Sequence, residues 1–194
     1  MTALSLVMLK RHLPPPAATS AFSAFTRHCT SSKAMTKGSW RGWAQLLHAL
    51  EAAGVQCSDS PDLTRLCDHA VQLLPGKLNR SVPYKCMSMP FSALVSMGYT
   101  GSAQPLLQAV TTAISRGRVM DTARFRNWRE LTRAAAELPG CSMETRQLLA
   151  QFAAKASNSV DDIDAEDVST LLNTMRLARW PSKEFGRQLA ERAA

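Results

Sequence analysis

Regularly spaced glycines limit the folds that this chain can adopt. Beyond residue 50, glycines about 20 residues apart follow apolar stretches, at Gly54, Gly76, Gly98, Gly117 and Gly140. Glycine accepts the left-handed backbone conformation that closes a helix, so it often stands just past a helix end. We therefore expect a series of short helices, each ended by a glycine.

Apolar residues between these glycines recur three and four positions apart, which is the period of one helix face. Eight such stripes occur, and the first and seventh carry leucine pairs in matching places, Leu46-Leu47 and Leu171-Leu172. The alternation with a period of two that marks a strand is nearly absent. The sequence predicts an all-α fold with eight helices of about 12–16 residues.

These helices pair into units of similar length. The first helices of successive pairs are expected to end near Gly54, Gly98, Gly140 and Arg179, at intervals of 44, 42 and 39 residues. A two-helix repeat of this length is typical of an αα-hairpin solenoid. We expect about four hairpins over residues 38–194. An irregular eight-helix bundle with accidental spacing is the alternative.

The chain before Glu51, its first acidic residue, is basic and rich in Ser, Thr and Ala. Residues 1–37 hold five basic and no acidic residues, whereas residues 38–194 hold 18 basic and 15 acidic residues. An acid-free basic leader is typical of a mitochondrial presequence. We expect a disordered targeting leader over residues 1–37 and a location in the mitochondrial matrix. A basic tail that targets nothing is the alternative.

Motifs for catalysis or cofactor binding do not emerge. Gly76-Lys77 is followed by Leu78 and lacks the earlier glycine of a P-loop, and residues 98–102 lack the G-x-S-x-G order. The acidic residues between Asp161 and Asp167 lie where a helix is expected to begin, so helix capping explains them. We expect no enzymatic activity, cofactor, metal, small-molecule substrate or membrane span.

The five cysteines are odd in number and widely spaced, at Cys29, Cys57, Cys67, Cys86 and Cys141. The absence of a C-x-x-C pair favours a reducing compartment over a disulfide framework. Cys67 and His69 lie two residues apart and would point away from each other on a helix. We expect small buried thiols.

One stretch is rich in arginine. It holds Asp121 and Glu130 against six basic residues, Arg116, Arg118, Arg124, Arg126, Arg129 and Arg133, and is locally +4. The last three are spaced to share one helix face, and arginine binds phosphate through paired hydrogen bonds. These six are the candidate RNA-binding residues. An acidic protein partner and a plain solvated face are the alternatives.

Trp40 and Trp43 flank Arg41 at the start of the first expected helix. Stacking on RNA bases is one interpretation of this pair. Covering the exposed end of a solenoid is the other.

Three segments carry a family resemblance. They read FSALVSMGY with PLLQAV (within residues 91–117), LTRAAAELPG with RQLLAQF (125–157) and LLNTMRLARW with FGRQLAERA (168–194). They resemble the roughly 40-residue helical hairpins of FAST-kinase-like, RAP-associated and octotricopeptide proteins. The resemblance implies work on mitochondrial RNA: transcript processing, RNA editing, or assembly and structure of the mitoribosome. The chain lacks a C-terminal RAP domain, so nuclease chemistry is not implied.

We therefore expect a non-catalytic subunit of a mitochondrial RNA–protein assembly, with other protein subunits as partners and RNA held by the arginine-rich face. A protein scaffold without direct RNA contact is the alternative function.

Overall fold

The computed structural model describes residues 12, 15–31, 36–79, 82–116, 120, 123–156, 165–181 and 183–192. Within these ranges the chain is all-α and contains no strand. Among the described residues, eight α-helices fall in the part where eight were predicted, and a further one, α2, precedes them. The α-helices are α2 (Pro15–Ser31), α4 (Trp40–Ala52), α5 (Pro61–Leu73), α6 (Met89–Ser96), α7 (Gln104–Ser115), α8 (Phe125–Glu137), α9 (Ser142–Ala156), α10 (Ala165–Leu177) and α11 (Lys183–Arg192). Short 3-10 helices lie between them: η1 (Cys57–Asp59), η2 (Leu74–Lys77) and η3 (Tyr84–Cys86).

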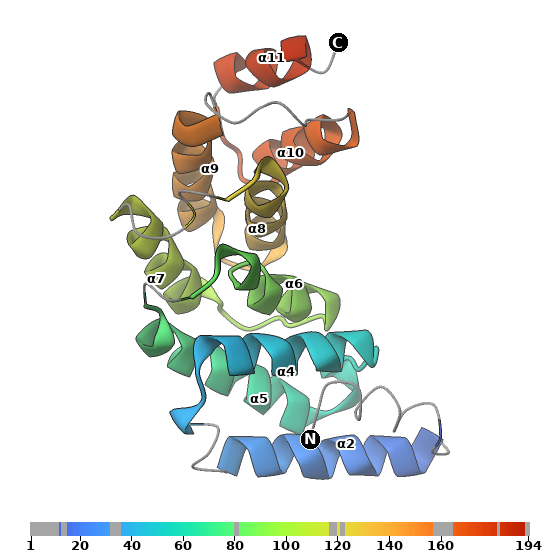
Figure 1. Cartoon of the computed structure of the whole chain (residues 1–194). Coiled ribbons are helices and arrows are strands. Elements are labelled where there is room, and N and C mark those ends of the chain that lie inside the picture. Colours follow the sequence, from blue (N-terminus) through green and yellow to red (C-terminus); the bar gives the residue numbers. More distant parts are fainter. Residues whose placement is uncertain are drawn as a thin grey trace.

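The helices stack in successive layers from α2 at one end to α11 at the other (Figure 1). Helices α4, α6, α8 and α10 contact one another in that order, and α5, α7 and α9 do the same. Helix α8 also packs on α9, and α10 contacts both α9 and α11. From α4 to α9, each layer is therefore joined to the next one twice, once through each row of helices, whereas α11 packs on α10.

Four residues with positive φ follow the ends of α4, α6, α8 and α10. They are Gly54 (64°), Gly98 (66°), Gly140 (73°) and Arg179 (50°), and each helix ends two or three residues before the predicted position. After Gly54, Gly98 and Arg179, the next N–H donates to the carbonyl five residues back, as in a Schellman motif. Helix α8 stops earlier, with Leu138 extended (ψ 137°), because Pro139 disfavours the helical conformation of the residue before it.

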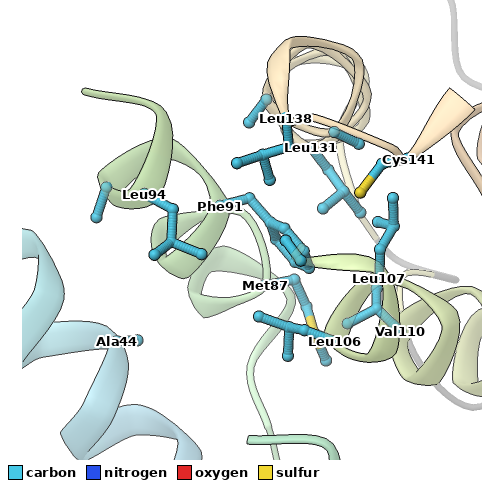
Figure 2. Packing of buried hydrophobic residues seen from close by; sticks show 14 of the residues in the cluster. Ala44, Met87, Phe91, Leu94, Leu106, Leu107, Val110, Leu131, Leu138 and Cys141 are labelled. Atoms are coloured by element: carbon cyan, nitrogen blue, oxygen red, sulfur yellow. The ribbon is translucent and has the colours of Figure 1, made fainter. Parts of the chain in front are cut away.

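The core between the layers is made of large apolar side chains. Figure 2 shows Phe91 and Met87 lying between Leu106 of α7 and Leu131 of α8, and all four are fully buried. Burying one such side chain stabilises a fold by about 1.5–3 kcal/mol, whereas an exposed ion pair contributes less than about 1 kcal/mol. Apolar packing therefore holds the layers together.

Aromatic rings replace aliphatic side chains toward the C-terminal end. Phe152 of α9 stacks on Trp128 of α8, with ring centroids 5.5 Å apart and planes 3° from parallel. It also contacts Phe125 at 5.0 Å and Phe185 of α11 at 5.8 Å, and Trp180 meets Phe185 at 5.6 Å. Phe185, which is buried, attaches α11 to this aromatic cluster.

The expected disordered leader is in part a helix. Residues 15–31 form α2, which packs on α5 and buries Thr26 and Cys29. The carboxylate of Asp62 on α5 accepts hydrogen bonds from the Ser23 hydroxyl (2.7 Å) and the Arg27 guanidinium (3.0 Å). This part of the leader is helical in the structure. Residues 1–11 and 32–35 lie outside the described residues.

The sequence pattern misplaces one leucine. Leu171 is fully buried, but Leu172, predicted to share its apolar stripe, is 43% exposed and lies beside Gly186 of α11. Adjacent residues on a helix point about 100° apart, so the second leucine of a pair can fall outside the buried face.

No helix among the described residues is long and apolar enough to cross a membrane.

We predict that Gly98→Ala lowers the free energy of unfolding by about 1–2 kcal/mol, because the left-handed conformation at this position disfavours a side chain. An added Cβ would also lie 3.3 Å from Oε1 of Gln56. Gly76→Ala is the matched control, since no atom lies within 4 Å of its added Cβ. Urea unfolding of both variants measures the difference. Equal stabilities would contradict the structural role of the left-handed conformation at Gly98.

We predict that Asp62→Asn loosens α2, measured as faster trypsin cleavage after Arg27 at neutral pH. Asp59→Asn, an exposed change in η1, is the control and should leave the rate unchanged. The Ser23 hydrogen bond, followed by Arg27, lowers the pKa of Asp62 in the folded protein. A lowered pKa gives stability that is complete above the ordinary carboxyl pKa of about 4 and is lost as pH falls below it. Hydrogen-exchange protection factors of α2 should fall in that acid range.

Candidate nucleic-acid interface

Five of the six candidate arginines are described by the structure, one just after α7 and four at the start of α8 or within it. Arg116 follows the last residue of α7 and is exposed. Arg118 lies outside the described residues. Neither Arg116 nor Arg124 has an ion pair with a carboxylate in the described part of the chain, so both present free guanidinium groups to solvent there.

Arg124 occupies the N-cap position of α8 and is exposed. Its backbone N–H donates to Oδ1 of Asn127 at 3.2 Å, and its carbonyl accepts the N–H of Asn127 at 3.0 Å. This reciprocal pair satisfies backbone groups that a helix start leaves without partners. The backbone from which the Arg124 side chain projects is therefore fixed.

Arg126 and Arg133 each pair with a glutamate one turn further along α8. Arg126 Nε lies 2.9 Å from Glu130, and Arg133 Nη1 lies 3.1 Å from Glu137. The Arg126 side chain is 76% exposed and that of Arg133 is 40% exposed. Exposed pairs of this spacing contribute only about 0.3–0.5 kcal/mol, so a phosphate can replace the glutamate at little cost.

Arg129 has a different environment. Its side chain is 17% exposed and forms an ion pair with Asp167 of α10, which is 9% exposed. The pair joins two helices that also pack against each other. Arg129 therefore links α8 to α10 and is poorly placed to meet a ligand from solvent.

The structure separates the three α8 arginines that the sequence grouped on one face. Arg126 and Arg133 are accessible, whereas Arg129 is turned toward α10. Of the three carboxylate partners, sequence reasoning named Glu130 within the arginine-rich stretch and missed Glu137 and Asp167. The i,i+4 spacing of Arg133 and Glu137 is a signal that finds the first. Nothing local in the sequence finds the second, which comes from the next hairpin.

The accessible part of the site is positively charged, and among the described residues Arg116 and Arg124 have no carboxylate partner. Guanidinium groups offer planar pairs of donors that fit phosphate oxygens. The arrangement is suited to binding a phosphate backbone without reading bases. No group of three or more His, Cys, Asp or Glu side chains among the described residues has the geometry of a metal site.

The aromatic pair near the N-terminal end is not available for stacking on bases. Trp40 is 1% exposed and Trp43 is fully buried. Trp40 Nε1 donates to the carbonyl of Cys86 at 2.9 Å, and Trp43 meets His69 edge-on at 5.9 Å. The base-stacking interpretation is therefore wrong, and both rings belong to the core of the first layers.

We predict that Arg129→Ala lowers the free energy of unfolding by about 3 kcal/mol, because it leaves the carboxylate of Asp167 buried without this cation. Arg126→Ala, on the exposed side of the same helix, should change it by less than about 0.5 kcal/mol. Replacing both partners, as Arg129→Leu with Asp167→Leu, should recover part of the loss. Urea unfolding of the three variants tests this. A similar loss in both alanine variants would show that the pair has no special structural role.

Comparisons with family models, with curated proteins and with solved structures find no match to this chain. Its function has to be argued from its residues and their geometry.

Proposed function

We propose that this chain is a non-catalytic helical-repeat subunit of a mitochondrial RNA–protein assembly, and that it contacts RNA through the arginines around the start of α8. The observation that carries the proposal is the exposure of Arg116, Arg124 and Arg126, two of them without a carboxylate partner in the described chain. The basic, acid-free leader supports the mitochondrial location.

We also infer that the stacked helices form an αα-hairpin solenoid. Hydrogen bonds that join neighbouring layers recur at a separation of 40 residues, close to the repeat length. They run from Cys57 N–H to Met97 O (2.8 Å), from Gln104 Nε2 to Glu144 Oε1 (3.0 Å) and from Gln151 Nε2 to Thr111 O (3.4 Å). Other bonds between layers span 31 residues, from Tyr99 to Asp68, and 38 residues, from Arg129 to Asp167. Contacts at separations near the repeat length are expected of repeats that touch only their neighbours.

The arginines have unequal parts in this proposal. Arg116, Arg124 and Arg126 are the main phosphate-binding residues, Arg133 is a half-exposed addition, and Arg129 supports the helix. Arg118 remains a candidate from the sequence alone. Because these contacts are to phosphate, they favour binding with little dependence on base sequence.

A protein scaffold without RNA contact is the second candidate. It is favoured by large apolar side chains exposed on α9 and α10: Met143 is 66% exposed, Leu172 43% and Leu177 40%. Apolar side chains that remain exposed in the isolated chain are suited to a protein neighbour.

We predict that the purified chain binds single-stranded RNA and that binding weakens steeply with salt. Each phosphate contact contributes about 0.7 to the slope of log K against log salt. Replacing Arg116, Arg124 and Arg126 together by Ala should therefore reduce that slope by about 2. A filter or fluorescence titration of a labelled oligonucleotide at several salt concentrations measures it.

The matched control replaces three exposed arginines elsewhere, Arg41, Arg176 and Arg187, which removes the same net charge. This variant should keep the wild-type slope. If both triple variants lose the same slope, the binding is unspecific and the assigned face is wrong. Absence of binding even at low salt would rule out direct RNA contact and favour the scaffold function. In that case the double variant Leu172→Ser with Leu177→Ser should lose proteins that co-purify with the wild-type chain.

A further inference from the structure

Two thiols lie close together after Gly54, which follows the end of α4. Sγ of Cys57, in η1, lies 3.9 Å from Sγ of Cys67, in α5. Cys67 is fully buried, whereas Cys57 is partly exposed, in contrast to the buried thiol expected from the sequence. Cys29, Cys86 and Cys141 have no such sulfur neighbour within the described ranges.

The surroundings hold Cys57 in place from two sides. Its N–H donates to the carbonyl of Met97 in the next layer at 2.8 Å, and its carbonyl accepts the hydroxyl of Thr64 on α5 at 3.2 Å. The adjacent Gln56 donates to the carbonyl of Ser96 at 3.1 Å. The approach of the two sulfur atoms is therefore fixed by the fold and does not depend on a free loop.

We propose that Cys57 and Cys67 are a peroxide-sensitive dithiol that closes into an intramolecular disulfide. The two sulfur atoms need to move from 3.9 Å to about 2.0 Å apart. Rotation of the Cys57 side chain, which is only partly packed, provides part of this movement. Their separation in sequence is ten residues, so the bond ties η1 to α5.

The chemistry balances with hydrogen peroxide as the oxidant. The Cys57 thiolate attacks one peroxide oxygen, the O–O bond breaks, and hydroxide leaves to become water on protonation. The Cys67 sulfur then attacks the sulfur of the resulting sulfenic acid, and the hydroxyl group leaves as a second water with the Cys67 proton. Two thiols and one peroxide become one disulfide and two waters.

The first of these steps favours Cys57 over Cys67. The hydrogen bond from Cys67 is the main cause that lowers the pKa of Cys57. That same hydrogen bond and burial raise the pKa of Cys67. The partly exposed Cys57 is thus the thiol that forms a thiolate and meets the oxidant. Cys67 is the resolving thiol because its sulfur lies 3.9 Å away.

The bond would form where the first two layers meet. Tyr99, which follows the corner at Gly98, donates its hydroxyl to Asp68 at 2.6 Å, one residue after Cys67. The disulfide therefore links η1 to the part of α5 that holds the second layer. This proposal does not rest on RNA binding, so each can fail without the other.

Oxidation of the full chain with hydrogen peroxide, followed by alkylation and trypsin digestion without reduction, tests it. Cleavage after Arg65 separates the two cysteines, so the disulfide must appear as peptide 42–65 joined to peptide 66–77. Mass spectrometry should find this pair at a mass two hydrogens below the sum of the two peptides, and dithiothreitol should abolish it.

Cys57→Ser should abolish the linked peptides, and Cys86→Ser, at a similarly half-buried position, should leave them unchanged. Recovery of both peptides alkylated after peroxide treatment would overturn the proposal. Linkage of Cys57 to another cysteine, or its conversion to sulfinic acid while Cys67 is alkylated, would overturn it equally.

Discussion

The stack of helices depends on one constraint: the chain must reverse its direction after the first helix of each pair. At Gly54, Gly98 and Arg179 a single left-handed residue stops the helix, and the next apolar residue turns back toward it. Those following residues, Val55, Tyr99 and Trp180, all pack against or within the core. A corner that satisfies the helix carbonyls and also buries an apolar side chain fixes the direction of the second helix.

The parts of the fold that sequence reasoning predicted are those governed by local chemistry. Glycine tolerates positive φ, so the corners at Gly54, Gly98 and Gly140 could be placed within three residues. Gly76 is also a glycine, but it lies inside the 3-10 helix η2, which begins at Leu74, and has no left-handed conformation. Helix α2 was missed because its stability comes from α5 and Asp62, which its own sequence does not display.

The arginines show the same limit at the candidate site. Their helix and approximate face follow from spacing, and the glutamate partners of Arg126 and Arg133 lie within one turn. The environment of Arg129 depends on α10, which begins 36 residues later in the chain. A local charge count treats these arginines as equivalent, whereas packing makes one of them part of the link between two helices.

The difference between the exposed arginines and Arg129 determines which of them could hold an RNA strand. Helix α8 is fixed by the stack of Trp128 on Phe152 and by the ion pair of Arg129 with Asp167, so the outer arginines project from a rigid support. Ordering a long side chain at an interface costs about 0.5–1.5 kcal/mol, and the pair with Glu130 already restricts Arg126. A charge-assisted hydrogen bond to phosphate contributes about 1.5–3 kcal/mol, well above the 0.3–0.5 kcal/mol of the exposed pair that it replaces. The exchange of glutamate for phosphate is therefore favourable at Arg126. At Arg129 a phosphate would have to replace Asp167, and breaking the ion pair of this buried carboxylate would be unfavourable.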